Sequence, residues 1–207
     1  MQHTIAIVDC GSGNIERVQR AYEDLGARAI VVADDVRLLA RADRIILTDA
    51  GAFPDAMRHL RTRGLDEALS REVLEGGVPF LGIGLGMQLI AAVSDELTET
   101  KGLGWIDARA VPLTPTEADR PTPHTGWNEV WPVCASPLFD GIRPGEVFDF
   151  RHSFHVVCAE DYEVLATTPH RGRFVSAIQC GHVFGVQFHP ETSGPTGLRL
   201  LENFLSV

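Results

Sequence analysis

The stretch Val78-Pro79-Phe80-Leu81-Gly82-Ile83-Gly84-Leu85-Gly86 contains the pattern that decides the fold. Residues 78–83 form an apolar run that predicts a buried β-strand, and the apolar spacing from Leu85 to about Val93 predicts a helix. A short strand that is apolar on both faces and leads directly into a helix is typical of a parallel sheet covered by helices on both sides.

The same alternation extends through the first half of the chain. Apolar runs at 4–8, 29–32 and 45–47 predict further strands. Helical spacing begins at Ile15 and ends near Leu25, where Gly26 stops the helix. A long helical region follows the strand at 45–47 and continues through Leu65, Ala68, Leu69 and Val73. We therefore expect strands and helices to alternate up to about residue 93.

The second half has a different pattern, in which strand follows strand. After Gly104 we expect strands at 108–113, 129–133, 147–150, 153–157, 163–167, 174–179 and 182–187, and a closing helix from about Pro195. A loop rich in proline and threonine, at 112–123, is the least structured stretch. We predict a single domain over residues 1–207, with a three-layer, flavodoxin-like α/β fold whose mostly parallel open sheet has an antiparallel extension.

Composition excludes several classes of function. The 207 residues are 44% hydrophobic and 22% charged, which is typical of a globular protein. The 28 acidic residues outnumber the 18 Lys and Arg residues and no basic block is present, so we expect neither nucleic acid nor an anionic membrane surface as a partner. No apolar run reaches the roughly 18 residues that cross a bilayer and no signal peptide opens the chain, so we expect a cytoplasmic protein.

The cysteines agree with a reducing compartment. Four of them lie far apart and form no C-x-x-C pair, namely Cys10, Cys134, Cys158 and Cys180. This spacing predicts reduced thiols rather than a disulfide framework or a zinc site. We expect no metal ion and no cofactor.

The glycines at 82, 84 and 86 have the G-x-nucleophile-x-G spacing of a nucleophile elbow, a sharp strand-to-helix turn. An active elbow carries Ser or Cys at its centre, where the helix N-terminus lowers the pKa of a thiol. Here the centre is Gly84. Taken alone, the motif also fits a glycine-rich turn that only packs tightly, whereas a P-loop is excluded because no G-K-[ST] follows.

A second motif, Val186-Gln187-Phe188-His189-Pro190-Glu191, ends the last expected strand. Its histidine lies at the carboxyl edge of the sheet, where open α/β sheets bind their ligands. Glu191 can accept the imidazole N–H and fix the tautomer of His189. A lone histidine is more often structural, but the neighbouring carboxylate and the elbow favour a catalytic pair.

Together these motifs resemble the triad (class I) glutamine amidotransferases and, within that family, the glutaminase subunits of imidazole glycerol phosphate synthase (HisH type). Similar landmarks run nearly from end to end of the chain: Asp9–Asn14, Gly51–Phe53, Leu85–Gln88, Gly102–Gly104, Pro123–Asn128, His152–Phe154 and Gln187–Glu191. The segments Gly11–Asn14 and Gly126–Asn128 favour the HisH type.

The resemblance implies a mechanism. In the family a cysteine thiolate attacks the glutamine side-chain amide, a histidine moves the proton to departing ammonia, and a glutamate orients the histidine. By position these roles fall on residues 84, 189 and 191, and the contacts to glutamine on Gly51, Gln88, Glu96, Ser153 and Phe154. Ammonia then enters a cyclase (β/α)8-barrel partner, and the subunits form a heterodimer through a face that includes Asn14 and the segment Gly126–Asn128.

The chain departs from this pattern at several positions. Gly84 stands at the nucleophile position, and Thr48-Asp49-Ala50-Gly51 replaces Pro-Gly-Val-Gly in the segment that completes the oxyanion hole. An acidic side chain at 49 facing the site would oppose an oxyanion. Phe154 replaces a tyrosine, and Cys10, also at a tyrosine position, is a weak candidate for a substitute nucleophile.

Two hypotheses follow from the missing thiolate. In the first, the chain binds glutamine without efficient turnover, whether the glycine at 84 is natural or introduced. In the alternative, it is a pseudo-glutaminase, a non-catalytic subunit that docks on and regulates a barrel synthase using free ammonia. Both hypotheses predict a protein partner. A more distant alternative is a changed enzyme of a biosynthetic side pathway that uses the crevice for a ligand other than glutamine, with Asp49 and Cys10 as its first candidate residues.

Overall fold

The computed structural model describes residues 3–10, 15–113, 123–170 and 172–207. The landmark Gly11–Asn14, including the expected partner contact Asn14, lies outside the described residues, as does most of the proline-rich loop.

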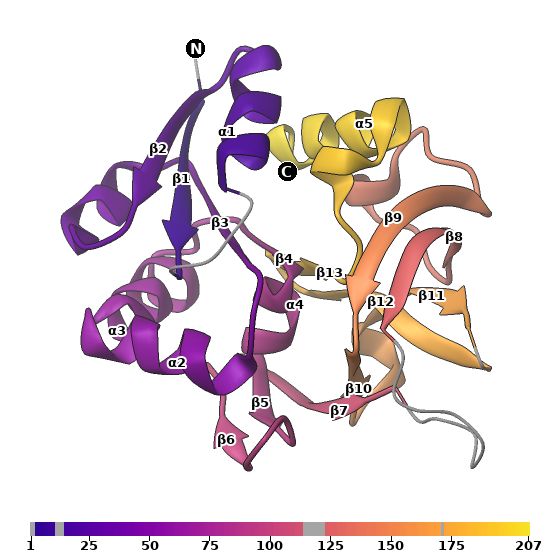
Figure 1. Ribbon diagram of the computed structural model, residues 1–207. Helices are drawn as coiled ribbons and strands as arrows, with labels where there is room; N and C mark the ends of the chain where they lie inside the picture. The colour runs from indigo at the N-terminus through magenta and orange to yellow at the C-terminus, as the bar shows by residue number, and fades with distance from the viewer. Residues whose placement is uncertain (1–2, 11–14, 114–122, 171) are drawn as a thin grey trace.

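The first half of the chain forms the parallel part of the sheet (Figure 1). Its strand order is β2 (Arg28–Val32), β1 (Thr4–Asp9), β3 (Arg44–Asp49), β4 (Phe80–Gly84) and β13 (Val183–Val186). Every neighbouring pair in this series is parallel. The last of these strands comes from the far end of the sequence, so it places residue 189 at the same edge of the sheet as residue 84.

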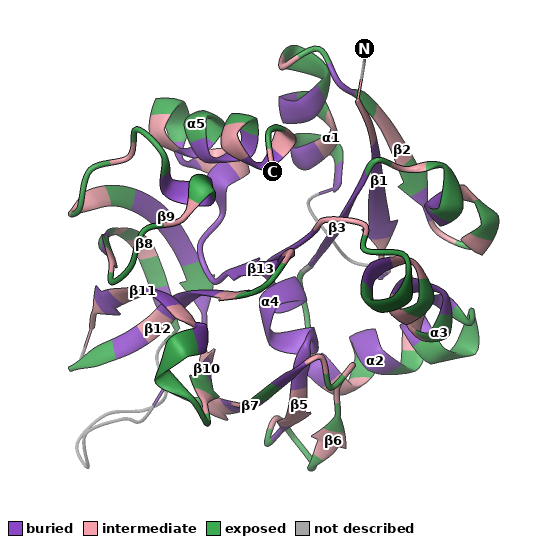
Figure 2. Ribbon diagram, turned by 180° about the vertical axis from the view of Figure 1, so that it is seen from behind, coloured by how far each residue is buried: buried purple, intermediate pink, exposed green. Residues whose placement is uncertain are grey.

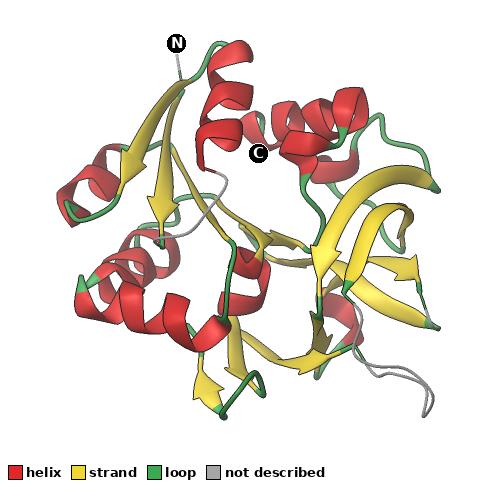
Figure 3. Cartoon of the chain, viewed as in Figure 1, coloured by secondary structure: helices red, strands yellow, loops and turns green. Residues whose placement is uncertain are grey.

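Beyond β13 the sheet becomes mostly antiparallel. It continues through β12 (Arg173–Cys180), β10 (Phe154–Cys158), β7 (Ile106–Pro112), β5 (Ala91–Ser94) and β6 (Thr100–Lys101). A branch leaves this path through β11 (Val164–Pro169), β8 (His124–Pro132) and β9 (Glu146–His152). Figure 3 shows this branch curling away from the helical half.

Helices cover both faces of the parallel part. On one side α1 (Ile15–Asp24) and α5 (Gly194–Leu205) lie together, and on the other lie α2 (Phe53–Thr62), α3 (Leu65–Ser70) with its π-helical continuation Arg71–Glu75, and α4 (Leu85–Leu89) (Figure 1). Alternate residues of β1 therefore enter different cores: Ile5 and Ile7 belong to the cluster with α1 and α5, and Ala6 and Val8 to the cluster with α2 and α3. Figure 2 shows the resulting buried centre between the two helical layers.

Three expected boundaries are wrong. The helix after the elbow ends at Leu89 instead of Val93. The backbone N–H groups of residues 103–105 donate hydrogen bonds to the carbonyls of residues 89–91, and strand β5 begins at Ala91. The long helical region is divided at Gly64, whose φ of +66° a right-handed helix does not allow. Strand β8 begins at His124, five residues before the expected start at 129, where pairing with β9 overrides the local pattern.

Candidate functional site

The elbow is a sharp connection between β4 and α4. Gly84 has φ +60° and ψ −115°, a backbone conformation that residues with a side chain rarely adopt. The flanking glycines have no room for a side chain: a Cβ on Gly86 would lie 1.9 Å from the carbonyl oxygen of Leu47, and one on Gly82 2.6 Å from that of Gly86. The helix therefore packs directly against the sheet, and residue 84 stands at the strand's carboxyl end.

The neighbouring strand end carries the segment expected to complete an oxyanion hole. In the parallel pairing of β3 with β4, Asp49 lies beside Gly84. The side chain of Asp49 is outside what the structure describes, so its expected charge near an oxyanion stays a prediction. Gly51 follows with φ +118°, which is again in the region that favours glycine.

His189 and Glu191 form a buried pair just after β13. Nδ1 of His189 lies 2.9 Å from Oε1 of Glu191, and the two side chains are 8% and 0% exposed. A carboxylate can only accept at this contact, so Nδ1 carries the proton and Nε2 is the basic nitrogen. The backbone is held on both sides, since the His189 N–H donates to the carbonyl of Asp149 and its carbonyl accepts from Ser193 Oγ.

A cavity of about 340 Å³ brings most of the sequence-predicted residues together. Six of them line it: Gly51, Gln88, Glu96, Ser153, Phe154 and His189. Gly84 is not among the lining residues, but the next residue, Leu85, is. Glu191 stands behind the histidine instead of in the cavity wall.

Sequence reasoning missed other parts of the cavity wall: Ala50, Pro123, Arg151, His152 and Gln187. His152 and Gln187 belong to motifs that the sequence singled out, so their positions offered a signal. Arg151 offered none, because only the pairing of β8 with β9 brings its strand end to the cavity.

Gln88 is fixed by its own amide hydrogens. Its Nε2 donates to the carbonyl of Phe154 at 3.0 Å and to Oε1 of Gln187, also at 3.0 Å, and the side chain is buried. An amide that has given both hydrogens has only its oxygen left to offer a ligand. The cavity therefore contains an acceptor suited to an N–H group.

Glu96 has a structural contact as well as a place in the cavity wall. Its Oε2 accepts from the backbone N–H of Phe53 at 2.7 Å, at the start of α2. The N-cap of that helix, Ala52, has no side-chain oxygen to do this. The next residue, Leu97, has φ +59°, which marks a strained turn beside the cavity.

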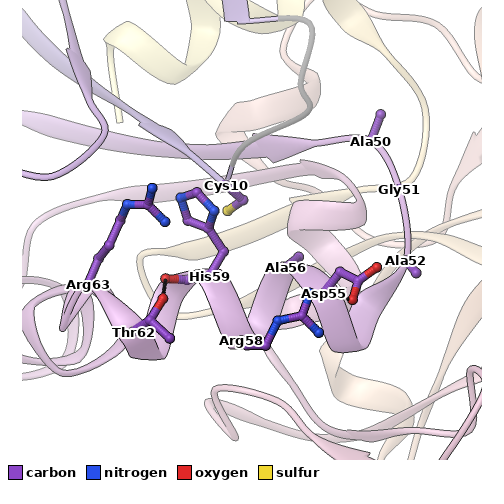
Figure 4. Close-up of a pocket in the computed structure, with 10 residues that line it drawn as sticks. All are labelled: Cys10, Ala50, Gly51, Ala52, Asp55, Ala56, Arg58, His59, Thr62 and Arg63. Carbon is purple, nitrogen blue, oxygen red and sulfur yellow. Dashed lines mark hydrogen bonds and ion pairs between the residues drawn. The ribbon is translucent and has the colours of Figure 1, made fainter.

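Cys10 lies in a different cavity. This second cavity, of about 440 Å³, is lined by Cys10, His59 and other residues of α2, and it shares Ala50 and Gly51 with the first (Figure 4). The segment 50–51 therefore stands between the two. Cys10 does not line the cavity of His189, which leaves it badly placed as a substitute nucleophile.

The sequence also led to expectations about disulfides, metal ions and membrane-spanning segments. All four cysteines are free thiols. Among the described residues no group of three or more His, Cys, Asp or Glu side chains could hold a metal ion. No helix in this part of the chain is long and apolar enough to span a membrane.

Comparison with known proteins identifies the family. Residues 6–207 match the family model described as "Glutamine amidotransferase class-I". The chain belongs to this family. It is 41% identical over 206 residues to imidazole glycerol phosphate synthase subunit HisH of Ruegeria pomeroyi, covering 97% of each chain. It is 43% identical over 200 residues to the subunit of the same name from Moorella thermoacetica, covering 97% of this chain and 93% of that one.

Several solved structures share the fold. The structure of PurLQS from Thermotoga maritima superimposes with a TM-score of 0.79 at 18% identity, covering 100% of this chain and 99% of that one. A Thermoplasma acidophilum protein described as part of a GMP synthase gives 0.75 at 20% identity, with 100% and 94% covered. The predicted α/β class, a mostly parallel open sheet with an antiparallel extension, is confirmed.

Proposed function

We propose that this chain is the glutamine-binding subunit of an imidazole glycerol phosphate synthase or a close paralogue, and that it binds glutamine without hydrolysing it efficiently. Full-length identity of about 40% to HisH subunits supports the assignment. One observation carries it: His189, Gln88 and Glu96 line the same cavity. Leu85, which also lines this cavity, directly follows Gly84 at the centre of the elbow.

The reaction of an active relative defines what each residue does. A thiol at position 84 would give its proton to His189 Nε2 and attack the side-chain carbonyl carbon of glutamine. The C–N bond then breaks, a thioester forms, and ammonia leaves with the proton that Nε2 returns. Water, deprotonated by the same nitrogen, would then cleave the thioester to glutamate and regenerate the thiol. Glu191 holds the imidazole in the tautomer that both steps need.

Gly84 removes the first bond-forming step, because glycine has no side chain to attack the amide. His189 can still activate water, but a site that loses its nucleophile loses on the order of 10⁶-fold in turnover. Binding depends on different groups, namely Gln88, Glu96, Ser153 and Phe154, and these are present around the cavity. Affinity for glutamine and turnover of glutamine should therefore separate in this chain.

The test is glutamate release from glutamine by the chain and by its Gly84→Cys variant, each with a cyclase barrel and the barrel's own substrate. Calorimetry on the parent chain measures glutamine affinity separately. We expect binding by both proteins and turnover only by Gly84→Cys. Ready glutamate production by the parent chain would refute the proposal.

A non-catalytic docking protein is the second candidate. Its support is an exposed aromatic and aliphatic surface on β8 and β9, where Trp127 is 61%, Trp131 37% and Val147 43% exposed. Residues 127, 129 and 131 of β8 alternate onto one face, as a strand requires. Tight binding of the barrel without any glutamine affinity would favour this candidate over the first.

A further inference from the structure

Four polar side chains form a continuous chain of hydrogen bonds between strand β8 and the cavity. Asn128 Nδ2 lies 3.0 Å from His124 Nε2, and His124 Nδ1 lies 2.9 Å from His152 Nε2. His152 Nδ1 lies 2.8 Å from the carbonyl oxygen of Phe154, which is also 3.0 Å from Gln88 Nε2. The two histidines face each other as a cross-strand pair of β8 and β9.

The donor-to-acceptor direction of these hydrogen bonds is determined at the outer end of the series, at Asn128. The backbone N–H of Glu129 donates to Asn128 Oδ1 at 2.8 Å, and Asn128 Nδ2 donates to the carbonyl of Pro169 at 2.9 Å. Both partners fix which end of the amide is nitrogen. Asn128 therefore gives its second hydrogen to His124, and Nε2 of His124 accepts it.

The proton positions of both histidines follow from this first bond. Because His124 accepts at Nε2, its Nδ1 carries the hydrogen that goes to His152 Nε2. His152 in turn donates from Nδ1 to the carbonyl of Phe154, which can only accept. Each of the three bonds from Asn128 to the Phe154 carbonyl thus points from the surface strand towards the cavity.

This arrangement needs both rings to be neutral, since a doubly protonated ring would turn an N–H towards its neighbour's donor. Burial lowers the pKa of His152 to about 3, and burial together with the stacked His170 ring lowers the pKa of His124 to about 4. Neither ring is charged at neutral pH. The chain of donors and acceptors is therefore complete in the folded protein.

At its inner end, this series of hydrogen bonds determines the orientation of the Gln88 side-chain amide. The Phe154 carbonyl receives two hydrogens, one from His152 and one from Gln88. If the Gln88 amide rotated by half a turn, its oxygen would face both the Phe154 carbonyl and Oε1 of Gln187. Holding the Phe154 carbonyl in place therefore holds the Gln88 oxygen free for a ligand.

We propose that His124 and His152 are positioning residues of the glutamine cavity, which through the Phe154 carbonyl fix Gln88 with its oxygen towards an N–H group of the bound amino acid. The ligand's identity rests on the function proposed above, whereas the orientation of Gln88 does not. Neither histidine was assigned such a role by its sequence motif.

Three variants separate this role from mere packing. His152→Leu removes the donor to Phe154, while His152→Asn keeps an amide N–H near the position of Nδ1. His155→Leu is the matched control. His155 is a partly buried histidine of β10 that contacts the same Phe174 ring but takes no part in the series of hydrogen bonds. Circular dichroism and a thermal melt establish that each variant is folded.

Two measurements are made on the parent chain and on each variant. The side-chain amide resonance of Gln88, assigned by its absence in Gln88→Ala, reports the orientation of that amide without any ligand. Calorimetry reports the affinity for glutamine. We expect His152→Leu to move the Gln88 resonance and to weaken glutamine binding about tenfold, roughly the loss of one hydrogen bond. His152→Asn should restore both, and His155→Leu should change neither.

An unchanged Gln88 resonance in folded His152→Leu would overturn the proposal, and so would equal shifts in His152→Leu and His155→Leu. If the resonance moves as expected but no protein in the series binds glutamine, the positioning role stands and the proposed function fails. The two results are therefore distinguishable.

Discussion

The imidazole of His189 and the carboxylate of Glu191 lie 2.9 Å apart, with the Glu191 side chain wholly buried. A short 3₁₀ turn, Pro190–Thr192, brings the two side chains together although they are only two positions apart. The contact leaves Nε2 of His189 to act towards the cavity. We expect this nitrogen to act as the base of the proposed glutamine site, in a chain whose elbow has glycine at residue 84.

The first prediction concerns this pair in the Gly84→Cys variant. Glu191→Gln places an amide where the carboxylate was, which stabilises the wrong tautomer of His189 with little change of shape. We expect kcat for glutamate release to fall by about 10²–10⁴-fold, with little change in KM. Steady-state kinetics measure this. Equal kcat values in Gly84→Cys and in the double variant with Glu191→Gln would show that Glu191 does not orient the histidine.

Glu96 should link glutamine binding to the stability of α2. Its carboxylate accepts the N–H of Phe53 at the start of that helix. Glu96→Ala should lower the free energy of unfolding by about 0.5–2 kcal/mol, as the loss of an N-cap does, and should also weaken glutamine binding. Glu96→Gln keeps an acceptor and should retain most of the stability. Urea denaturation and calorimetry measure the two effects, and identical stability of Glu96→Ala and the parent chain would contradict the assignment.

The parallel core and the histidine–glutamate pair were predictable because local sequence determines them. A strand buried on both faces must be apolar throughout, and the run at 78–83 shows this directly. The second motif predicted His189 and Glu191 because neighbours in sequence remain neighbours in a turn.

What could not be predicted depends on pairing between distant segments. Strand β5 replaces the end of the expected helix because residues 103–105 supply backbone partners from outside it. The bond between His124 and His152 depends on the register of β8 against β9, and the hydrophobic pattern of β8 did not reveal even its first residues. The sequence likewise did not reveal that Cys10 lies outside the cavity of His189, because this depends on how segment 50–51 is placed between the two cavities.

Gly86 should tolerate no side chain. An alanine Cβ there would lie 1.9 Å from the carbonyl oxygen of Leu47, so α4 would have to move away from β3. We expect Gly86→Ala to lower the free energy of unfolding by about 3 kcal/mol. Gly104→Ala is the comparison, because Gly104 has φ +69° but open space around it, and a cost of about 1–2 kcal/mol is expected there. A smaller loss in Gly86→Ala than in Gly104→Ala would contradict the close packing.

The cysteines should differ sharply in reactivity. Cys134 and Cys180 are exposed, whereas burial, with Glu163 and Asp161 nearby, raises the pKa of Cys158 to about 12. A thiol-specific reagent at about pH 8 should therefore label the two exposed cysteines quickly and leave Cys158 unmodified in the folded protein. Mass spectrometry of peptides identifies the labelled positions. Rapid labelling of Cys158 would show that its surroundings are more open than the structure indicates.

Acid should destabilise the fold through the two paired histidines. The folded pKa values of His124 and His152 are about 4 and 3, below the value of about 6.5 expected in the unfolded chain. Between these limits the unfolded chain binds protons that the folded chain does not, so the free energy of unfolding falls as the pH falls below about 6.5. Above about pH 7.5 both states are neutral at these positions, and the contribution is constant.

Urea denaturation at about pH 7.5, 6.5 and 5.5 measures this dependence. We expect the free energy of unfolding of the parent chain to decrease across the series, and that of His152→Asn to decrease less, because this variant has one fewer histidine to protonate on unfolding. Identical slopes for the parent chain and His152→Asn would show that His152 binds its proton equally well in both states.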